Sequence, residues 1–436
     1  MARLILLLLL TLSTNTYASL DMNLLKSLLQ SGQALKAFSY ASDEMADYEG
    51  TPEFDYYYAI AAIDSGHASE GVFALERVLL MDAGNYAARL ELARGYFVLE
   101  EYARSRQEFE TVLTADPPEE VVNSVQLYLD AIVTQEGRYK TTQTGFVEFG
   151  LGSDSNANSG PDIVSYDIGP FKVPLDINSR ELDDSFNDLK LGYKVSTPVS
   201  PGVSYFLALN AGFHENSDNS QFDTRTYTVG TGFKFLEGES AFTLDLLLQQ
   251  FELDGNSYQS LTGLNSSWLH NLTEQSAVQV YLQLSKIDYD LLTTPDANTI
   301  SLGSSYSTKL SAKFSPVLIA GLYMAQDDPK LNTAAAREST ERDYYGIQLA
   351  TILGLSNSVS VKLSLRYQDT QYKVANALIG KRRQDDLFST SLDVVWRLAR
   401  RWQLLPKINI VKSNSNIELY EYDRTLYSVN LRYSVK

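Results

Sequence analysis

Residues 358–368 read Ser-Val-Ser-Val-Lys-Leu-Ser-Leu-Arg-Tyr-Gln, and this stretch sets the pattern for the C-terminal two thirds of the chain. Every second residue from Val359 to Tyr367 is apolar, and the residues between them are polar. Successive side chains of a strand point to opposite faces, so the alternation predicts a β-strand with one apolar and one polar face. A soluble sandwich could use one such strand. The pattern recurs about fourteen times after residue 142, however, which predicts an antiparallel transmembrane β-barrel.

The connections between the predicted strands alternate in length. The short ones include 197–202, 236–240, 271–275, 354–357 and 399–401, and the long ones include 154–184, 290–298, 327–342 and 372–385. Bacterial outer-membrane barrels have an even number of strands, short periplasmic turns and long outer loops. The pattern therefore predicts an outer-membrane protein of a Gram-negative bacterium, with everything before the barrel in the periplasm.

The first residues are typical of an export signal. Arg3 precedes the apolar run 4–12, and Thr16-Tyr17-Ala18 forms a small-x-small cleavage site, so residues 1–18 are predicted to be a signal peptide. The chain has no cysteine, which excludes disulfides and thiolate metal sites. The net charge of -18 argues against nucleic acid as a partner, because phosphate binding needs clustered Lys and Arg. The 28 tyrosines, with a mean hydropathy of only -0.18, suit a barrel with aromatic girdles.

Residues 19–138 are predicted to form a periplasmic α-helical repeat domain, followed by the barrel over 139–436. A shift of 34 residues places Ala59 on Ala93, Leu75 on Phe109 and Val78 on Val112. That period, with small residues where helices cross, resembles the tetratricopeptide repeat. Such repeats present a surface that holds a peptide or a partner protein, and the alternative is a spacer that only positions the barrel. We expect a client protein and the membrane lipid as partners, and a monomer. The fold class is thus α plus β, with helical repeats before a barrel of about fourteen antiparallel strands.

Inward-facing charges gather on the last strands of the predicted barrel. They are candidate lumen-lining residues: Lys362, Arg366, Asp393, Arg397, Lys407 and Arg432. They could form a substrate path, but such residues more often form a neutralised network that keeps a barrel rigid. The three histidines, His67, His214 and His270, lie far apart in the sequence and support neither a metal site nor a catalytic triad. We therefore predict no enzyme activity and no cofactor.

A short motif stands at the outer end of the first predicted strand. It runs from Gly150 to Asn158 as Gly-Leu-Gly-Ser-Asp-Ser-Asn-Ala-Asn, and its candidate functional residues are Gly150, Asp154, Asn156 and Asn158. The three Asp and Asn residues alternate, and a turn built from their side chains is favoured over a calcium site because carboxylates are too few. With the repeats and the fourteen-strand barrel, this motif resembles the surface lipoprotein assembly modulator (Slam) family. The resemblance implies an outer-membrane translocator that delivers a specific client, a surface lipoprotein or a haem/iron-binding protein, to the cell surface, and it carries no catalytic residue.

Two other functions suit the same architecture. An exopolysaccharide export porin also joins helical repeats to a barrel, but with more repeats and a strongly charged lumen. A passive porin would need an open lumen and a constriction loop, and the long loop 154–184 could be one only if it folds inward. The sequence does not identify the client.

Overall fold

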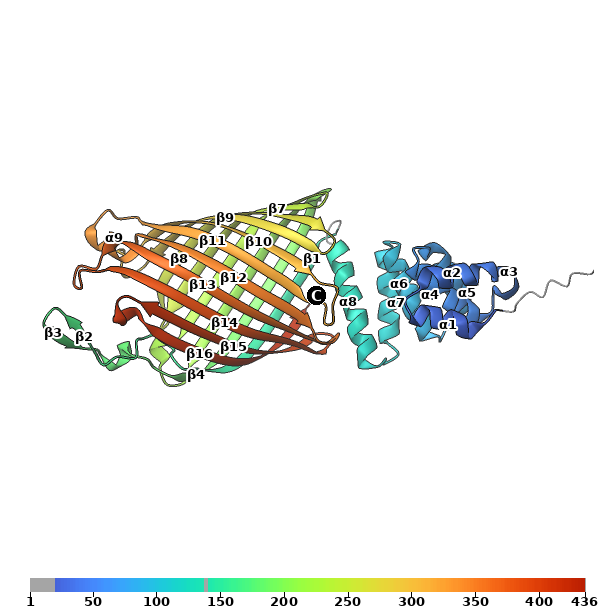
Figure 1. The fold of residues 1–436 in the computed structure, drawn as a ribbon, viewed down its shortest axis with the longest axis horizontal. Helices are drawn as coiled ribbons and strands as arrows, with labels where there is room; N and C mark the ends of the chain where they lie inside the picture. The colour runs from blue at the N-terminus through green and yellow to red at the C-terminus, as the bar shows by residue number, and fades with distance from the viewer. Residues whose placement is uncertain (1–19, 137–139, 436) are drawn as a thin grey trace, which may run out of the picture. The chain divides into compact units, whose positions relative to one another are not determined.

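The computed structural model describes residues 20–136 and 140–435 (Figure 1). The predicted signal peptide lies outside these residues. Contacts divide the chain into two compact units at Pro117 and Pro118. The domain boundary expected between residues 138 and 139 stays a prediction, and the two units are described separately below.

The first unit is built from helical hairpins. Its helices are α1 (Met22–Gln30), α2 (Ala34–Asp43), α3 (Met45–Tyr48), α4 (Pro52–Asp64), α5 (Ala68–Met81), α6 (Tyr86–Val98) and α7 (Tyr102–Leu113). Phe54, Leu75 and Val78 are fully buried in its core. A side chain at Gly71 on α5 would lie 2.8 Å from the Ala59 carbonyl of α4, so these two helices need a small residue where they cross. The predicted tetratricopeptide-like region is confirmed.

Helix α8 (Glu119–Glu136) groups with the barrel. The side-chain amide of Asn357, in the barrel turn 355–358, donates a hydrogen bond to Ser124 Oγ on α8 at 3.2 Å. Among the described helices, none is both long and apolar enough to cross a membrane.

Fourteen antiparallel strands close into a barrel, as predicted. They are β1 (Thr142–Asp154), β4 (Asp184–Ser200), β5 (Val203–Asn216), β6 (Thr224–Glu237), β7 (Ser240–Leu253), β8 (Asn256–Thr273), β9 (Ser276–Tyr289), β10 (Ala297–Lys309), β11 (Val317–Pro329), β12 (Arg342–Gly354), β13 (Val359–Ala375), β14 (Arg382–Ala399), β15 (Trp402–Ser415) and β16 (Tyr422–Val435). Each strand pairs with its neighbours in the chain, and β16 pairs with β1 to close the ring. This β1–β16 junction is called the seam below.

The strand register sorts the side chains into two faces. On β13, Leu363 and Leu365 are exposed on the outer surface, while Lys362 and Arg366 alternate with them and face inward. Since cross-strand partners share a face, the register carries this division from strand to strand around the ring. The outer face is apolar for lipid, and the inner face is mainly polar.

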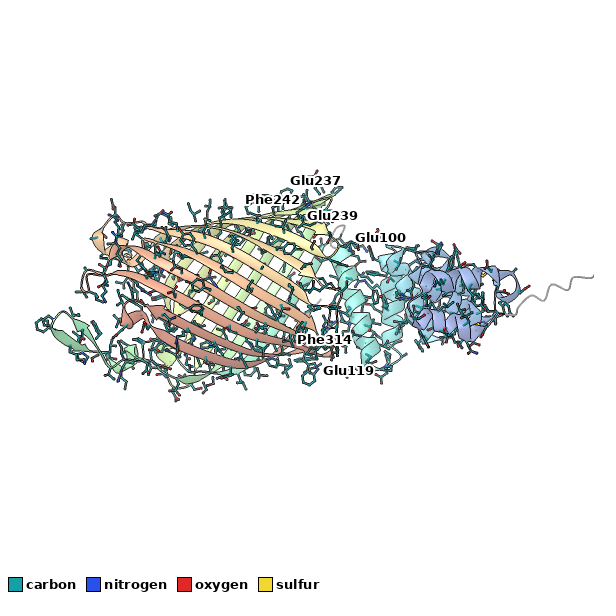
Figure 2. The ribbon with its side chains drawn as sticks, viewed as in Figure 1. Glu100, Glu119, Glu237, Glu239, Phe242 and Phe314 are labelled. Carbon is teal, nitrogen blue, oxygen red and sulfur yellow. The ribbon has the colours of Figure 1, made fainter. Side chains whose placement is uncertain are left out.

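The two ends of the barrel differ in their connections. Most turns at one end are short, such as 201–202, 238–239 and 400–401, and Glu237 and Glu239 flank the tip of one of them (Figure 2). The other end carries the longer loops, so it faces outward by the rule for bacterial barrels. Strands β13 and β14 are longer than expected, and the loop predicted over 372–385 shrinks to 376–381. The first loop, 155–183, contains a hairpin of β2 (Ser165–Ile168) and β3 (Phe171–Pro174) that extends beyond the barrel's outer end (Figure 1). The loop before β12 contains α9 (Ala334–Thr340).

Candidate functional site

The register places all six predicted lumen residues at inward positions on β13 to β16. Lys362, Asp393 and Lys407 form one row across β13, β14 and β15, because Asp393 pairs with both lysines. Lys407 Nζ lies 3.4 Å from Asp393 Oδ1, and these side chains are 47% and 30% exposed. This pair is therefore solvated, with charges that partly neutralise one another.

Arg366 on β13 and Arg397 on β14 have different surroundings. Arg366 donates from Nε to the Tyr323 hydroxyl at 2.8 Å and from Nη2 to Gln368 Oε1 at 2.9 Å. Arg397 lies opposite Gln403 near the short-turn end of the barrel. Neither arrangement brings a nucleophile or an acid–base pair together.

Arg432 belongs to a tighter group at the seam. Its Nη2 and Nε lie 2.5 and 2.7 Å from Glu148 Oε2 on β1, and the Asn430 amide donates to Glu148 Oε1 at 2.5 Å. The Glu148 side chain is only 4% exposed, whereas that of Arg432 is 34% exposed. An almost buried carboxylate thus joins the last strand to the first from inside the barrel.

The group continues onto the next two strands. Lys190 Nζ on β4 lies 3.9 Å from Glu148 Oε1 and 3.0 Å from Asp188 Oδ2, and Asp188 Oδ1 is 2.8 Å from His214 Nδ1 on β5. These residues are called the seam cluster below: Arg432, Asn430, Glu148, Lys190, Asp188 and His214. The cluster alternates charge along four adjacent strands, so each buried carboxylate has a cationic or protonatable neighbour.

A second ion pair closes the seam at its outer end. Asp154 is fully buried, and Arg424 on β16 donates to both of its carboxylate oxygens, with Nη2 at 2.5 Å from Oδ2. We call this pair the outer clamp.

The rest of the motif anchors the first loop. Asn156 donates to the Gly160 and Asp423 carbonyls, and Asn158 donates to the Asn178 and Arg180 carbonyls. The backbone amide of Gly160 in turn donates to both Asn side chains. These side chains thus bond the backbone of their own loop and of β16, an arrangement that fixes the base of the loop.

The two motif glycines stand between the seam cluster and the outer clamp. A side chain at Gly150 would lie 2.6 Å from Asn430 Oδ1. One at Gly152 would lie 2.5 Å from the Tyr427 carbonyl oxygen and would collide with the Phe186 ring. Glycine is therefore required at position 152 by close approach to backbone, whereas a side chain at position 150 would require the Asn430 side chain to move.

Sequence reasoning missed Glu148, Lys190, Asp188 and Arg424. Each has an ordinary place in an alternating strand, so alternation alone does not single it out. Aligning β1 with β16 in an antiparallel pair would have placed Glu148 beside Arg432 and indicated the ion pair.

The wall opposite the seam is different in chemistry. The inward residues of β8, β9 and β10 from Gln259 to Ser307 carry no charge and are mostly Ser, Thr, Asn, Gln and Gly, with Tyr281 packed over Gly303. The polar groups of this part of the inner surface are hydroxyls and amides, with a few aliphatic side chains such as Leu261 and Ile287 between them.

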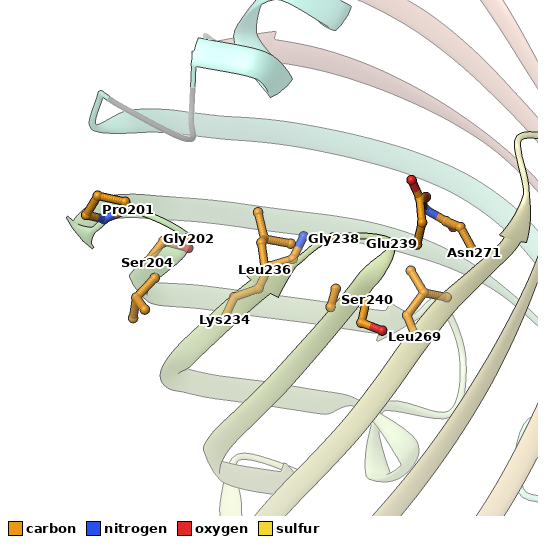
Figure 3. A pocket seen from close by; sticks show the side chains of 12 residues that line it. Pro201, Gly202, Ser204, Lys234, Leu236, Gly238, Glu239, Ser240, Leu269 and Asn271 are labelled. Carbon is orange, nitrogen blue, oxygen red and sulfur yellow. Dashed lines mark hydrogen bonds between the residues drawn. The ribbon is translucent and has the colours of Figure 1, made fainter.

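The short-turn end of the barrel has a pocket lined by two successive turns, 201–202 and 238–239, and by the end of β8 (Figure 3). Its volume is about 500 Å³, and its lining includes Lys234, Leu236, Glu239, Leu269 and Asn271. The Asn271 backbone amide donates to the Glu239 carbonyl, which joins the end of β8 to the turn 238–239. The pocket mixes charged, amide and apolar groups at the mouth of the barrel.

In the helical unit, α1, α4 and α6 are the first helices of their hairpins, and they contribute residues to one face. Tyr56 and Tyr57 on α4 lie half-buried there with their rings 5.1 Å apart, and Lys26 on α1 lies 4.8 Å from the centre of the Tyr57 ring. Arg94 on α6 contacts Asp64 and Glu91 on the same side. Burial raises the pKa of Tyr56, and Glu91 raises it further, so its hydroxyl stays protonated. We call these residues the tyrosine face.

Comparison with known proteins decides the family. A family model described as surface lipoprotein assembly modifier matches residues 146–433. The chain belongs to this family. It is an outer-membrane β-barrel protein of a transport and assembly family, not an enzyme.

Individual relatives are more distant. The chain is 22% identical over 381 residues to the surface lipoprotein assembly modifier of Moraxella catarrhalis, a match that covers 84% of this chain and 70% of the relative. Among solved structures, it is similar to the outer membrane channel DcaP of Acinetobacter baumannii, with 11% identity, a TM-score of 0.42 and coverage of 68% of this chain and 97% of the other. The helical part is similar to the second tetratricopeptide-repeat domain of human RPAP3, with 17% identity, a TM-score of 0.23 and coverage of 25% and 89%.

Proposed function

We propose that this protein carries one specific client, a surface lipoprotein or a haem/iron-binding protein, across the outer membrane. The helical repeats bind the client in the periplasm, and the barrel passes it outward. The observation that carries the proposal is the union, in one chain of this family, of tetratricopeptide-like repeats with a closed barrel whose inner wall is polar. One chain closes its own barrel, which supports a monomer.

The tyrosine face supports the binding step. Tyrosine offers a large contact area and a hydroxyl at low entropic cost, and it is enriched where proteins bind other proteins. Paired carboxylates and cations beside Tyr56 and Tyr57 can exchange partners with a bound polypeptide. This combination suits a protein ligand better than a bare spacer.

Surface display of candidate clients tests the proposal. Lipoproteins encoded beside this gene are co-expressed with it, one at a time, in cells that lack their own exporter, and surface exposure is read by protease treatment of intact cells. We expect one candidate to become accessible, and to lose that access when residues 20–117 are deleted. If none reaches the surface while the purified barrel conducts ions or exports polysaccharide, a porin or a polysaccharide exporter replaces the translocator.

A matched pair of variants separates binding from spacing. Replacing Tyr56 and Tyr57 together by alanine should lower display by at least about tenfold, the effect of losing roughly 1.4 kcal/mol of binding. Phe73→Ala on α5, an exposed aromatic on a second helix of a hairpin, serves as the control and should leave display unchanged. Equal display by both variants would show that the tyrosine face does not bind the client. Circular dichroism confirms that each variant keeps its helices.

A further inference from the structure

Three cations stand at regular intervals along the inner face of β13 and β14. Arg397 on β14 is level with residue 358, because its backbone amide donates to the Ser358 carbonyl, and Lys362 and Arg366 follow on β13. Each step is four residues, which in an antiparallel strand corresponds to about 13 Å. We call these three residues the cation ladder. It runs from the short-turn mouth to about the middle of β13.

The cation ladder has no carboxylate partners. Among the residues that the structure describes, none of its three members forms an ion pair. Asp393 lies opposite Lys362, but the ion pair of Asp393 is with Lys407 on its other side. Over these levels, the inner face of β13 to β15 therefore carries four cations and one carboxylate, in a chain whose net charge is -18. The excess of positive charge on this wall is opposite in sign to the charge of the whole chain.

Neutral groups hold Arg366 in place. Its side chain is exposed to the lumen, and its Nε and Nη2 donate to the Tyr323 hydroxyl and to Gln368 Oε1 at 2.8 and 2.9 Å. The Tyr323 hydroxyl also donates to Gln368 Oε1, at 2.7 Å. These acceptors orient the guanidinium without neutralising it. Arginine has five N–H donors, and Nη1 has no acceptor among the described residues, so this end of the side chain is available to an anion.

The ladder and the rest of the lumen together suit an extended polypeptide. Successive side chains of an extended chain point to opposite sides, so residues four apart lie on one side, about 13 Å from one another. Carboxylates at that interval would meet the three cations in turn. The other side of the chain would meet uncharged groups, since the inward residues of β8 to β10 provide hydroxyls and amides. Charge and spacing are therefore complementary to a polypeptide with one acidic side.

We propose that the cation ladder binds an extended segment of the client in which acidic residues recur at intervals of four. This inference rests on the proposed function. The positive wall attracts carboxylates toward the short-turn mouth, where Arg397 lies. Each contact is solvated and therefore weak, and several weak sites in a row let a bound segment advance from Arg397 to Lys362 and then to Arg366.

Photo-crosslinking in nanodiscs tests the ladder without any client transport. The full chain carries p-benzoylphenylalanine in place of Ser364, on the inner face between Lys362 and Arg366, or, as the control, of Leu365 on the outer face. The probe is a biotinylated peptide of serine and threonine with three glutamates, each four residues from the next. We expect saturable labelling at position 364 and only background labelling at position 365. The same peptide with lysine in place of glutamate should not label either position.

Two changes test spacing and charge separately. Moving the middle glutamate of the probe by one residue turns its carboxylate to the other side. The concentration for half-maximal labelling should then rise roughly threefold, the effect of losing one exposed ion pair. In the protein, the triple variant Lys362→Gln, Arg366→Gln, Arg397→Gln should raise it roughly thirtyfold, because all three contacts are lost.

A matched triple variant controls for net charge. It removes three cations from outward positions of the barrel and should leave the labelling at position 364 unchanged. Its substitutions are Arg225→Gln, Lys286→Gln and Lys412→Gln. The shift in gel mobility on heating shows that each barrel is folded.

Three results would overturn the inference. The first is equal labelling by the two glutamate peptides, and the second is labelling that the ladder variant leaves unchanged. The third is displacement of the probe by trigalacturonate, an acidic glycan with three carboxylates, as effectively as by unlabelled peptide, since the ladder would then recognise a polysaccharide or any anion. Client display without peptide labelling would refute this inference alone. Peptide labelling in a protein that displays no client would refute the proposed function alone.

Discussion

The part of the barrel wall that contains the seam (β13 to β16, β1, β4 and β5), called the seam wall, and the part opposite it (β8 to β10) are both built from antiparallel strands. They differ in the side-chain contacts between neighbouring strands. From β13 through the seam to β5, inward carboxylates meet lysines, arginines or a histidine, whereas the inward residues of β8 to β10 carry no charge. Strands β8 to β10 follow one another directly in the chain. Strands β16 and β1 have the whole barrel sequence between them, so their pairing has a larger loop-closure cost. Two buried ion pairs, Glu148–Arg432 and Asp154–Arg424, thus join the two strands that the chain itself does not hold together, although Asp327–Arg342 shows that consecutive strands can carry one as well.

Replacing Glu148, the carboxylate at the centre of the seam cluster, should give the largest difference in stability between the two walls. Glu148→Leu leaves Arg432 and Lys190 without their shared partner, and we expect a loss of about 3 kcal/mol in the free energy of unfolding, at the low end for a buried pair because Arg432 is a third exposed. Gln283→Leu, on the inward face of β9, makes the same change of shape on the opposite wall and should stay within about 0.5 kcal/mol. Urea unfolding in detergent, followed by fluorescence of the three tryptophans, measures both.

The double variant Glu148→Leu, Arg432→Met distinguishes a pair effect from a general loss of packing. Replacing both partners of a buried ion pair by apolar residues is often close to neutral, so we expect most of the stability to return. Equal losses for Glu148→Leu and Gln283→Leu would contradict the comparison of the two walls.

The outer clamp should contribute less than the seam cluster. Asp154→Asn removes the charge opposite Arg424 but keeps an oxygen that can accept from the Asn156 amide, so the expected loss is about 2 kcal/mol. The base of loop 155–183 should also loosen, which faster protease cleavage of this loop on intact cells would reveal. Asp162→Asn, an exposed carboxylate in the same loop, is the control. Cleavage unchanged by Asp154→Asn would show that the asparagines anchor the loop without the clamp.

The sequence was most informative where structure repeats. Alternation predicted the strands, their faces and their number, because lipid imposes the same period on every strand. It missed the hairpin β2–β3 and helix α9, since these short elements lie in loops and bury too little apolar surface to leave a period. The predicted inward charges lie on inward positions, but their partners depend on the shear between strands. Glu148 meets Arg432 only because the ring closes with Gly150 opposite Asn430, and no local pattern contains that register.

The exposed ion pair of the seam wall, Asp393–Lys407, gives the smallest expected effect. It tests whether the burial of an ion pair or its charge alone determines its contribution to stability. Asp393 and Lys407 belong to the charged wall, yet both side chains are about a third to a half exposed. Screening by water and the entropy lost in ordering the long Lys407 side chain limit such a pair, so Asp393→Asn should cost only about 0.5 kcal/mol.

Salt makes the distinction sharper. At 1 M salt the screening length falls to about 3 Å, so the difference between Asp393→Asn and the parent should vanish while that of Glu148→Leu persists. Unfolding in urea at two salt concentrations measures both differences. If Asp393→Asn lowers the free energy of unfolding as much as Glu148→Leu does, and if this loss persists at high salt, then charge rather than burial stabilises this wall. The ion pairs at the seam would then contribute no more than exposed pairs elsewhere in the barrel.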